Sequence, residues 1–343
     1  MAHRLQSFWQ EELGTSSAGD GGEGRVVVRK GTSGLLIGAV FVATAFVAGC
    51  RAPIRSTPNK PPSPAEIAEL WREPEPNRDL FWGVGGRGLA PDPKATYTVT
   101  EVKRGGFSRG YTVTDPKGHE WSAKFPPEAS TEVVTSRLLW GIGYHQPPVY
   151  YLAEWQAHKA TSPNPQLPAR FRERTPDFHG LETGGTWSYY ENPFVGTRQL
   201  NGLLTVQAML GNSDLKDAQN ALYTFKEPVE GARQWFVARD LGQTFGRSGA
   251  LDPPRGDPDV FDKTGFITGV ENGVVRFDYN GRHRVLFDKI TPADVRWVCQ
   301  RLSALSDAQL HDAFRAGGYP RATADRFISR LRQKIAEGAQ LKD

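Results

Sequence analysis

The chain has 343 residues, of which 38% are hydrophobic and 23% are charged, and its formal net charge is +4. This length and composition suit a globular protein with one large domain or two small ones. The 37 Gly and 25 Pro residues favour loops and turns over long helical repeats. Lys and Arg residues are spread along the chain rather than gathered in a block, so we expect no nucleic acid partner.

The N-terminal region, residues 1–49, predicts a signal peptide. Arg29 and Lys30 precede a short apolar run that ends in small residues, and this run is short for a bilayer span. Its end, Val47-Ala-Gly-Cys50, resembles the bacterial lipobox, which implies cleavage before Cys50, lipidation of Cys50 and a membrane anchor. An uncleaved signal anchor is the alternative. Both interpretations place the remaining chain outside the cytoplasm.

Residues 50–94 are rich in proline and predict an extended tether, with one short helical stretch at Ala65–Trp71. Residues 95–155 predict a small β-rich N-lobe, and residues 156–343 a larger, mostly helical C-lobe. Residues 155–190 mix Pro, Gly and aromatic residues and predict no element.

The expected elements of the N-lobe follow from residue patterns. Three runs of β-branched and aromatic residues, 96–102, 110–115 and 120–125, predict strands that are joined by short turns. Pro126-Pro127 precedes apolar residues at helical spacing, which predicts a helix that ends near residue 141. A last strand is expected at 147–152. In the C-lobe, we expect a buried helix within 192–210, a strand at 234–238 and C-terminal helices that begin at Thr291-Pro292 and Ser306.

The turn between the first two strands carries Gly105 and Gly106. Glycines allow backbone N–H groups to approach an anion closely, so the hairpin could cover a phosphate, with Arg104 or Arg109 adding charge. Two motif matches have the wrong context. Gly83–Gly88 spells G-x-G-x-x-G without the flanking strand and helix, and predicts a loop. Ser108 in G-x-S-x-G has strands on both sides, and we interpret it as a hairpin residue.

Charged residues then follow in a definite order along the chain. Lys124 lies on the third strand, and Glu132 lies on the helix that follows. Asp214, Lys216 and Asn220 lie between two apolar runs. Asp240 in Asp-Leu-Gly242 ends a strand. We expect the core to hold the loop around Asp214 while its polar groups face a cleft.

This succession resembles the protein-kinase-like superfamily, especially its secreted, bacterial toxin-type and phosphoinositide kinase branches. The resemblance implies an α+β, two-lobed kinase-like fold and a phosphotransferase that uses ATP and Mg²⁺. It implies that Lys124 holds the nucleotide phosphates and that Glu132 orients Lys124. It also implies that Asp214, with Lys216 beside it, meets the acceptor hydroxyl of a protein or small molecule. Asp240 and Asn220 would hold Mg²⁺.

Two departures from the kinase pattern leave alternatives open. The metal-binding Asn is expected five residues after Asp214, where the chain has Gln219, and a one-residue bulge would be needed to bring Asn220 there. Asn212-Ser213 replaces the usual His-Arg pair. The alternative is a catalytically inactive kinase-like lipoprotein that binds a nucleotide or protein. A third possibility is an envelope lipoprotein that binds glycan or protein through an aromatic surface at Trp187–Tyr190.

Each residue also has a purely structural interpretation. Lys124 and Glu132 could form a surface ion pair, Asp214 could cap a helix, and Asp240 could be a turn residue. The chain also resembles a group of bacterial proteins of unassigned activity that have the same Asn-Pro-Phe and Asp-Leu-Lys segments. That resemblance implies no activity.

Overall fold

The structure is a computed structural model that describes residues 57–103, 105, 107–158, 168–174, 178–179, 182–249 and 253–343. Residues Arg51–Asp343 form one compact unit. The expected signal peptide and Cys50 lie outside the described residues. Within the described ranges, no helix has the length and apolar character needed to cross a bilayer.

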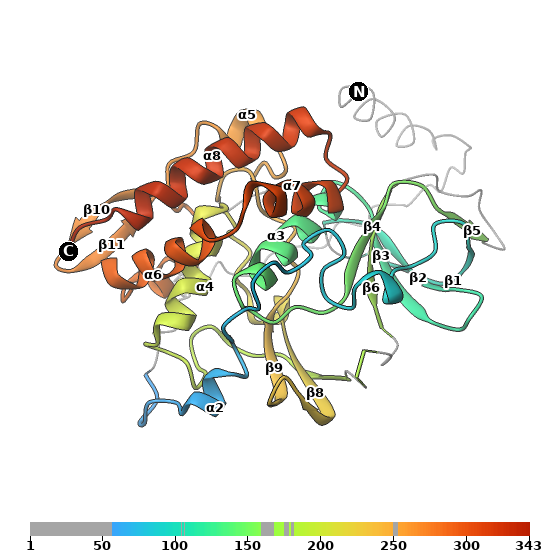
Figure 1. The fold of residues 1–343 in the computed structure, drawn as a ribbon, viewed down its shortest axis with the longest axis horizontal. Coiled ribbons are helices and arrows are strands. Elements are labelled where there is room, and N and C mark those ends of the chain that lie inside the picture. Colours follow the sequence, from blue (N-terminus) through green and yellow to red (C-terminus); the bar gives the residue numbers. More distant parts are fainter. Residues whose placement is uncertain are drawn as a thin grey trace, which may run out of the picture. The chain divides into compact units, whose positions relative to one another are not determined.

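A six-stranded sheet forms the β-rich part of this unit (Figure 1). Its strand order is β4-β6-β3-β2-β1-β5, and neighbouring strands are antiparallel except β1 and β5. The three predicted strands and the last predicted strand are confirmed as β1, β2, β3 and β4. The sheet also contains β5 and β6, so it continues past residue 155, where the N-lobe was expected to end. The strands span Thr96–Lys103 (β1), Gly110–Thr114 (β2), Glu120–Lys124 (β3), Val149–Leu152 (β4), Gln156–His158 (β5) and Ala169–Glu173 (β6).

The two faces of this sheet differ in chemistry because side chains alternate along each strand. Ala123 of β3 lies opposite Phe171 of β6, and both are buried in an apolar cluster. The next residue along β3, Lys124, lies opposite Arg170 and on the other face, and Ser122 lies opposite Arg172. One face therefore packs into a core, and the other carries cationic and polar side chains.

Helix α3, Ala129–Gly141, lies next to the sheet and contacts β4, β6 and α7 (Figure 1). Its start two residues after Pro127 confirms the predicted helix. Almost every residue of α3 is buried, including Glu132 and Arg137. A helix that is packed on all sides requires partners for its charged residues, and the partners of Glu132 form part of the site described below.

The C-terminal part is mainly helical, as predicted. Helix α4 is the buried helix expected within 192–210, and capping boxes start α6 at Thr291 and α7 at Ser306, as expected. Two small sheets, β7-β8-β9 and β10-β11, accompany the helices. The helices span Arg198–Met209 (α4), Pro258–Phe261 (α5), Pro292–Ser303 (α6), Asp307–Ala316 (α7) and Arg321–Ala339 (α8). The strands span Glu182–Gly185 (β7), Asn220–Val229 (β8), Ala232–Ala238 (β9), Ile267–Glu271 (β10) and Val274–Phe277 (β11).

Two expectations about surface segments are wrong. The short helical stretch expected in the proline-rich segment is present as α2 (Pro64–Ile67). However, Leu70 and Leu80 are fully buried in the main core, so residues 57–94 are not an extended tether. The aromatic residues at 187–190 are also buried: Trp187 packs in the core, and its Nε1 donates to Val237 O at 3.0 Å. They do not form the expected aromatic surface. The glycine motif at 83–88 is a loop, as predicted.

Candidate functional site

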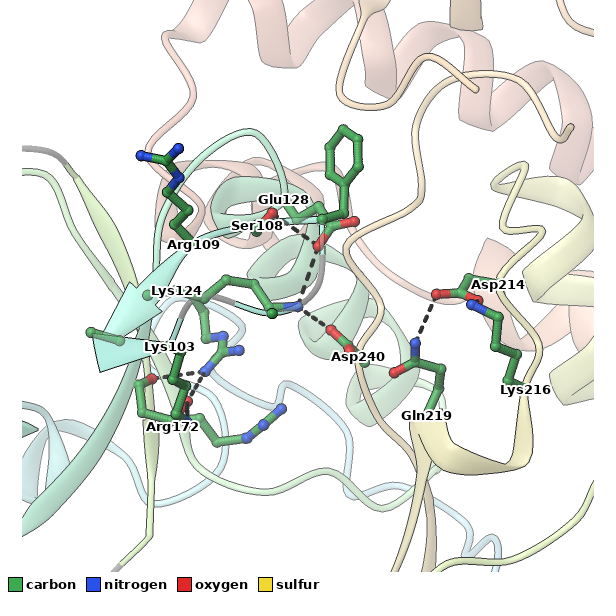
Figure 2. Close-up of a pocket in the computed structure, with 16 residues that line it drawn as sticks. Lys103, Ser108, Arg109, Lys124, Glu128, Arg172, Asp214, Lys216, Gln219 and Asp240 are labelled. Atoms are coloured by element: carbon green, nitrogen blue, oxygen red, sulfur yellow. Dashed lines mark hydrogen bonds and ion pairs between the residues drawn. The ribbon is translucent and has the colours of Figure 1, made fainter. Parts of the chain in front are cut away.

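A cavity of about 330 Å³ opens where the polar face of the sheet meets the loops that carry Asp214 and Asp240 (Figure 2). The β1–β2 hairpin covers it from one side. The cavity brings together residues that are distant in sequence and that the sequence analysis assigned to one site. Its lining consists of Lys103, Gly105, Phe107, Ser108, Arg109, Gly110, Ser122, Ala123, Lys124, Glu128, Arg170, Arg172, Asp214, Lys216, Gln219 and Asp240.

Lys124 lies at the centre of this cavity, at the end of β3. Its Nζ is 2.9 Å from Oε2 of Glu132 and 3.4 Å from Oε2 of Glu128, and it also contacts a carboxylate oxygen of Asp240. Burial disfavours the charged amine, but Glu132 and Asp240 outweigh this effect, and the pKa of Lys124 lies above its usual value. Lys124 is therefore positively charged at neutral pH.

Glu132 reaches Lys124 from α3 and is only 2% exposed. Its Oε1 is 2.9 Å from Nε of Arg170 and 3.3 Å from a guanidinium nitrogen of Arg172. Burial alone would raise the pKa of Glu132, but Arg170, Lys124 and Arg172 together hold it well below its usual range. The pair formed by Lys124 and Glu132 is thus an interior network and not the surface ion pair of the structural interpretation.

Glu128, at the start of α3, ties the hairpin to the rest of the site. Its carboxylate accepts a hydrogen bond from Ser108 Oγ at 3.0 Å and forms an ion pair with Arg255 at 2.6 Å. Ser108 is a hairpin residue, as predicted. Gly105 lines the cavity, whereas Gly106 and Arg104 lie outside the described residues.

Asp240 follows β9 and lines the cavity. Its backbone has a conformation that non-glycine residues rarely adopt. Its φ is 62°, which Asp tolerates better than most residues. The turn after it is fixed to α3, because Thr131 Oγ1 donates to Gly242 O at 2.6 Å and a Cβ on Gly242 would lie 2.4 Å from Cβ of Glu128. This turn therefore holds the carboxylate against Lys124.

Asp214 lies on a loop between α4 and β8 that the core holds in place. Leu215 is buried, and the buried Asn212 side chain bonds to Gln207 and accepts from the Asp214 N–H at 3.0 Å. The Asp214 carboxylate is 2.7 Å from Nζ of the exposed Lys216. These contacts agree with the expectation that the core holds the loop while its charged groups face the cavity. Asp214 caps no helix.

The structure places Gln219 at the cavity and Asn220 away from it, whereas Asn220 was the residue expected there. Gln219 lines the cavity and its Nε2 donates to Oδ2 of Asp214 at 2.8 Å (Figure 2). Asn220 begins β8 in regular register with Ala238 and does not line the cavity. Its Nδ2 instead donates to Trp187 O at 3.0 Å in the interior. The expectation that Asn220 would reach a metal is wrong, because no bulge displaces it towards the cavity.

A second cavity, of about 240 Å³, adjoins the first at Asp214. It shares Phe107, Glu128, Asp214 and Lys216 with the first cavity and adds His283 among its lining residues. Asp214 therefore lines two adjoining spaces.

The fit of Mg²⁺ to this site rests on Asp240. Among the described residues, no three His, Cys, Asp or Glu side chains lie close enough together to hold a metal by themselves. Mg²⁺ usually binds through one or two carboxylates together with substrate phosphates. Asp240, whose side chain is one-third exposed in the cavity, fits that role.

Three cations of the site were not predicted from the sequence: Lys103, Arg170 and Arg172. Arg170 and Arg172 lie in residues 155–190, which predicted no element. A signal was present in the chain, because Arg170-Phe-Arg172 alternates charged and apolar residues, which is the pattern of a strand with one polar face.

Among known proteins, the chain has a structural similarity but no sequence match. No protein-family model matches the chain. No curated protein sequence matches it. Among solved structures, it is similar to a proinflammatory kinase of Helicobacter pylori, CtkA, with 10% sequence identity and a TM-score of 0.43 over 72% of this chain and 97% of the other. The roles proposed below rest on the geometry of the site. The observed α+β architecture, with a β-rich and a mostly helical part, is consistent with the expected two-lobed kinase-like fold.

Proposed function

We propose that this protein is a kinase-like phosphotransferase that moves the γ-phosphoryl group of ATP to a hydroxyl of a protein or small-molecule acceptor. The observation that carries the proposal is that Lys124, Asp214 and Asp240 line one cavity although they come from three separate segments. Phosphoryl transfer requires little covalent chemistry from the protein. It requires that the charge of the phosphates is neutralised and that the attacking and leaving oxygens are aligned. This site offers groups for both requirements.

Lys124 and Asp240 would handle the donor. Their contact would open when phosphates enter, so that Lys124 turns to the phosphate oxygens while Glu132 keeps its Nζ in place. Asp240 would hold Mg²⁺ together with those phosphates, and the ion would supply the neutralisation of their charge. Gly105 of the hairpin would cover the phosphates from above.

Asp214 would handle the acceptor. From its position between the two cavities, its carboxylate would accept a hydrogen bond from the incoming hydroxyl and take its proton late in the transfer. Gln219 and Lys216 each hold one carboxylate oxygen, so the orientation of Asp214 is set before the acceptor binds. Lys216 would also approach the transferred phosphoryl group.

A binding module without catalysis is a second candidate function. The interior position of Asn220 favours it, because the second Mg²⁺ ligand of the kinase pattern is missing from the cavity. Such a protein would bind a nucleotide or a protein through the same cations and would not transfer phosphate.

The test is a thermal-shift and turnover experiment on the full chain with ATP, with and without Mg²⁺. Ligand at about 100 times its dissociation constant stabilises a protein by roughly 2.7 kcal/mol, a shift of several degrees. We expect Asp240→Asn to remove the part of the shift that needs Mg²⁺. Asp214→Asn should keep the shift and lose γ-phosphate release, while Asp217→Asn, at an exposed residue of the same loop, should keep both.

The outcomes separate the two candidates. A shift without phosphate release in the wild type would favour the binding module. Release that persists in Asp214→Asn and Asp240→Asn would overturn the assignment of the site.

Export and anchoring through Cys50 are part of the same proposal and rest on the lipobox resemblance alone. In a bacterial host, the full chain should incorporate labelled fatty acid and remain with the membrane fraction. Cys50→Ala should abolish labelling. Labelling that persists in Cys50→Ala would contradict lipidation at this residue, and membrane association without any labelling would favour the uncleaved signal anchor.

A further inference from the structure

One wall of the cavity carries cations that the proposed transfer does not use. Lys103 comes from β1, and Arg170 and Arg172 come from β6, so that the three flank Ser122 on the polar face of the sheet. Lys103 Nζ donates to Ser122 Oγ at 3.2 Å, and Arg170 donates to Ser122 O at 2.8 Å. We name Lys103, Ser122, Arg170 and Arg172 the cationic wall. Figure 2 shows Lys103 and Arg172 on the opposite side of Lys124 from Asp214.

The charges of this wall are not balanced by its neighbours. Glu132 is the carboxylate that contacts Arg170 and Arg172, and it is shared with Lys124. Lys103 has no carboxylate within ion-pair distance among the described residues; its polar contact is the Ser122 hydroxyl. Among the described lining residues there are six cations and three carboxylates, and Glu132 behind the lining is a fourth carboxylate. The cations are Lys103, Arg109, Lys124, Arg170, Arg172 and Lys216, and the lining carboxylates are Glu128, Asp214 and Asp240.

The titration of Lys103 agrees with this imbalance. Burial, together with Arg174, Arg172 and Arg170, lowers the pKa of Lys103 to about 8 and outweighs the opposing effect of Glu101. A group of like charges that lowers a lysine pKa provides a positive potential that an anion would relieve.

A purely structural role accounts for part of the wall. Arg170 is 1% exposed and grips Glu132 through Nε and a second guanidinium nitrogen, which suits a residue that holds Glu132 in place. That role does not account for Lys103, which is half-buried and points its amine into the cavity without a carboxylate partner. The structural role also explains Arg172 only in part, because its side chain is 16% exposed and its guanidinium nitrogen lies 3.3 Å from Glu132.

We infer that the ligand of this cavity is a polyanion with phosphate groups at two places, one at Lys124 and one at the cationic wall. This inference rests on the proposed function and names the chemistry of the donor. Phe107 has the apolar side chain that faces the cavity among the described lining residues, because the Ala123 methyl group packs into the apolar cluster on the other face of the sheet. The lining therefore offers far more contacts to phosphate oxygens than to a flat base. A chain of phosphates could come from inorganic polyphosphate or from a nucleotide, and both share this chemistry.

The experiment is isothermal titration of the full chain, with Mg²⁺, using tripolyphosphate, ATP and adenosine as separate ligands. We expect tripolyphosphate to bind within about tenfold of ATP, and adenosine to show no binding. Lys103→Met should weaken tripolyphosphate binding about tenfold or more, because it removes a charge-assisted hydrogen bond to phosphate. Lys117→Met, at an exposed lysine in the turn between β2 and β3, should change nothing.

Two results together would overturn the inference. ATP would bind more than about a hundredfold tighter than tripolyphosphate, and Lys103→Met would change the affinity for neither ligand. The proposed function could survive that result, because it depends on Asp214 and Asp240. Conversely, Lys103-dependent tripolyphosphate binding in a protein that shows no phosphate release from ATP or tripolyphosphate would support the inference and overturn the transfer. If none of the three ligands bound, both proposals would be wrong.

Discussion

Nζ of Lys124 lies 2.9 Å from Oε2 of Glu132, and this contact joins the end of β3 to the first turn of a buried helix. Arg170 and Arg172 contact the other oxygen of the same carboxylate. One buried carboxylate thus receives three cations from two neighbouring strands. The geometry of the proposed phosphate site and the stability of the sheet against α3 therefore depend on the same residue.

We predict that Glu132→Gln destabilises the protein by about 3 kcal/mol or more, because it leaves buried cations without their shared partner. The free energy of unfolding from urea titration at pH 7 measures this. The folded-state pKa of Glu132 is lowered, so its contribution is complete above about pH 4.5 and is lost as the pH falls below that value. The difference between wild type and Glu132→Gln should shrink in acid.

Glu120 provides the matched control for this prediction. It lies on the same strand as Lys124, and its carboxylate is 2.6 Å from Arg174, but both side chains are more than two-fifths exposed. Glu120→Gln should cost less than about 1 kcal/mol, as is usual for exposed ion pairs. Equal losses for Glu120→Gln and Glu132→Gln would show that the interior network has no special role.

The second prediction concerns the pH dependence of anion binding. The pKa of Lys103 is about 8 in the protein without ligand, and a bound anion favours the charged amine. Affinity for tripolyphosphate should therefore fall as the pH rises through 8. Lys103→Arg, which stays charged over this range, should have a flatter profile than the wild type. Because titration of the ligand is common to both proteins, only the difference between their profiles is diagnostic, and parallel profiles would contradict the prediction.

Much of the N-lobe could be predicted because its pattern is local. The strands at 96–102, 110–115 and 120–125 alternate apolar and polar residues, and α3 follows a proline pair. The positions of β5 and β6 depend on non-local pairing instead: β6 lies between β3 and β4 in the sheet, far from β3 in sequence. Pairing of this kind leaves only a short alternation in the sequence, such as Ala169–Glu173.

The same distinction between local patterns and non-local contacts explains which residues of the site could be predicted. The contact between Lys124 and Glu132 was expected from the kinase resemblance, and the structure brings the two together. The position of Asn220 was not predicted correctly, because the choice between neighbouring residues depends on backbone register. The turn at Asp217–Gln219 points Gln219 into the cavity, and β8 then fixes Asn220 in the interior. A one-residue difference of this kind is decided by tertiary hydrogen bonds, which motif spacing does not contain.

The third prediction concerns Lys334, a buried lysine of α8 far from the cavity. Its Nζ donates to Met209 O at 3.0 Å and to Thr264 Oγ1 at 2.9 Å, and burial with nearby Arg330 lowers its pKa to about 7. Between pH 7 and about 10, the unfolded chain keeps a proton that the folded protein has released, so stability rises with pH.

Lys334→Met should abolish this rise, which is at most about 1.4 kcal/mol per pH unit. Urea titrations at pH 7, 8 and 9 measure it, and the exposed Lys342→Met should keep the wild-type slope. A difference between wild type and Lys334→Met that is constant across this range would contradict the prediction.

The last prediction assigns Gln219 a positioning role. Its Nε2 donates to Asp214 at 2.8 Å, so Gln219→Leu removes a hydrogen bond to a charged carboxylate, which is worth about 1.5 to 3 kcal/mol. We expect γ-phosphate release to fall by roughly 10- to 100-fold while the affinity for ATP stays the same. Gln219→Glu would place a second carboxylate beside Asp214, so the acid limb of the pH–rate profile should move to higher pH. A residue that only fills space would not shift that limb, and an unchanged profile in Gln219→Glu would therefore show that Gln219 does not act through Asp214.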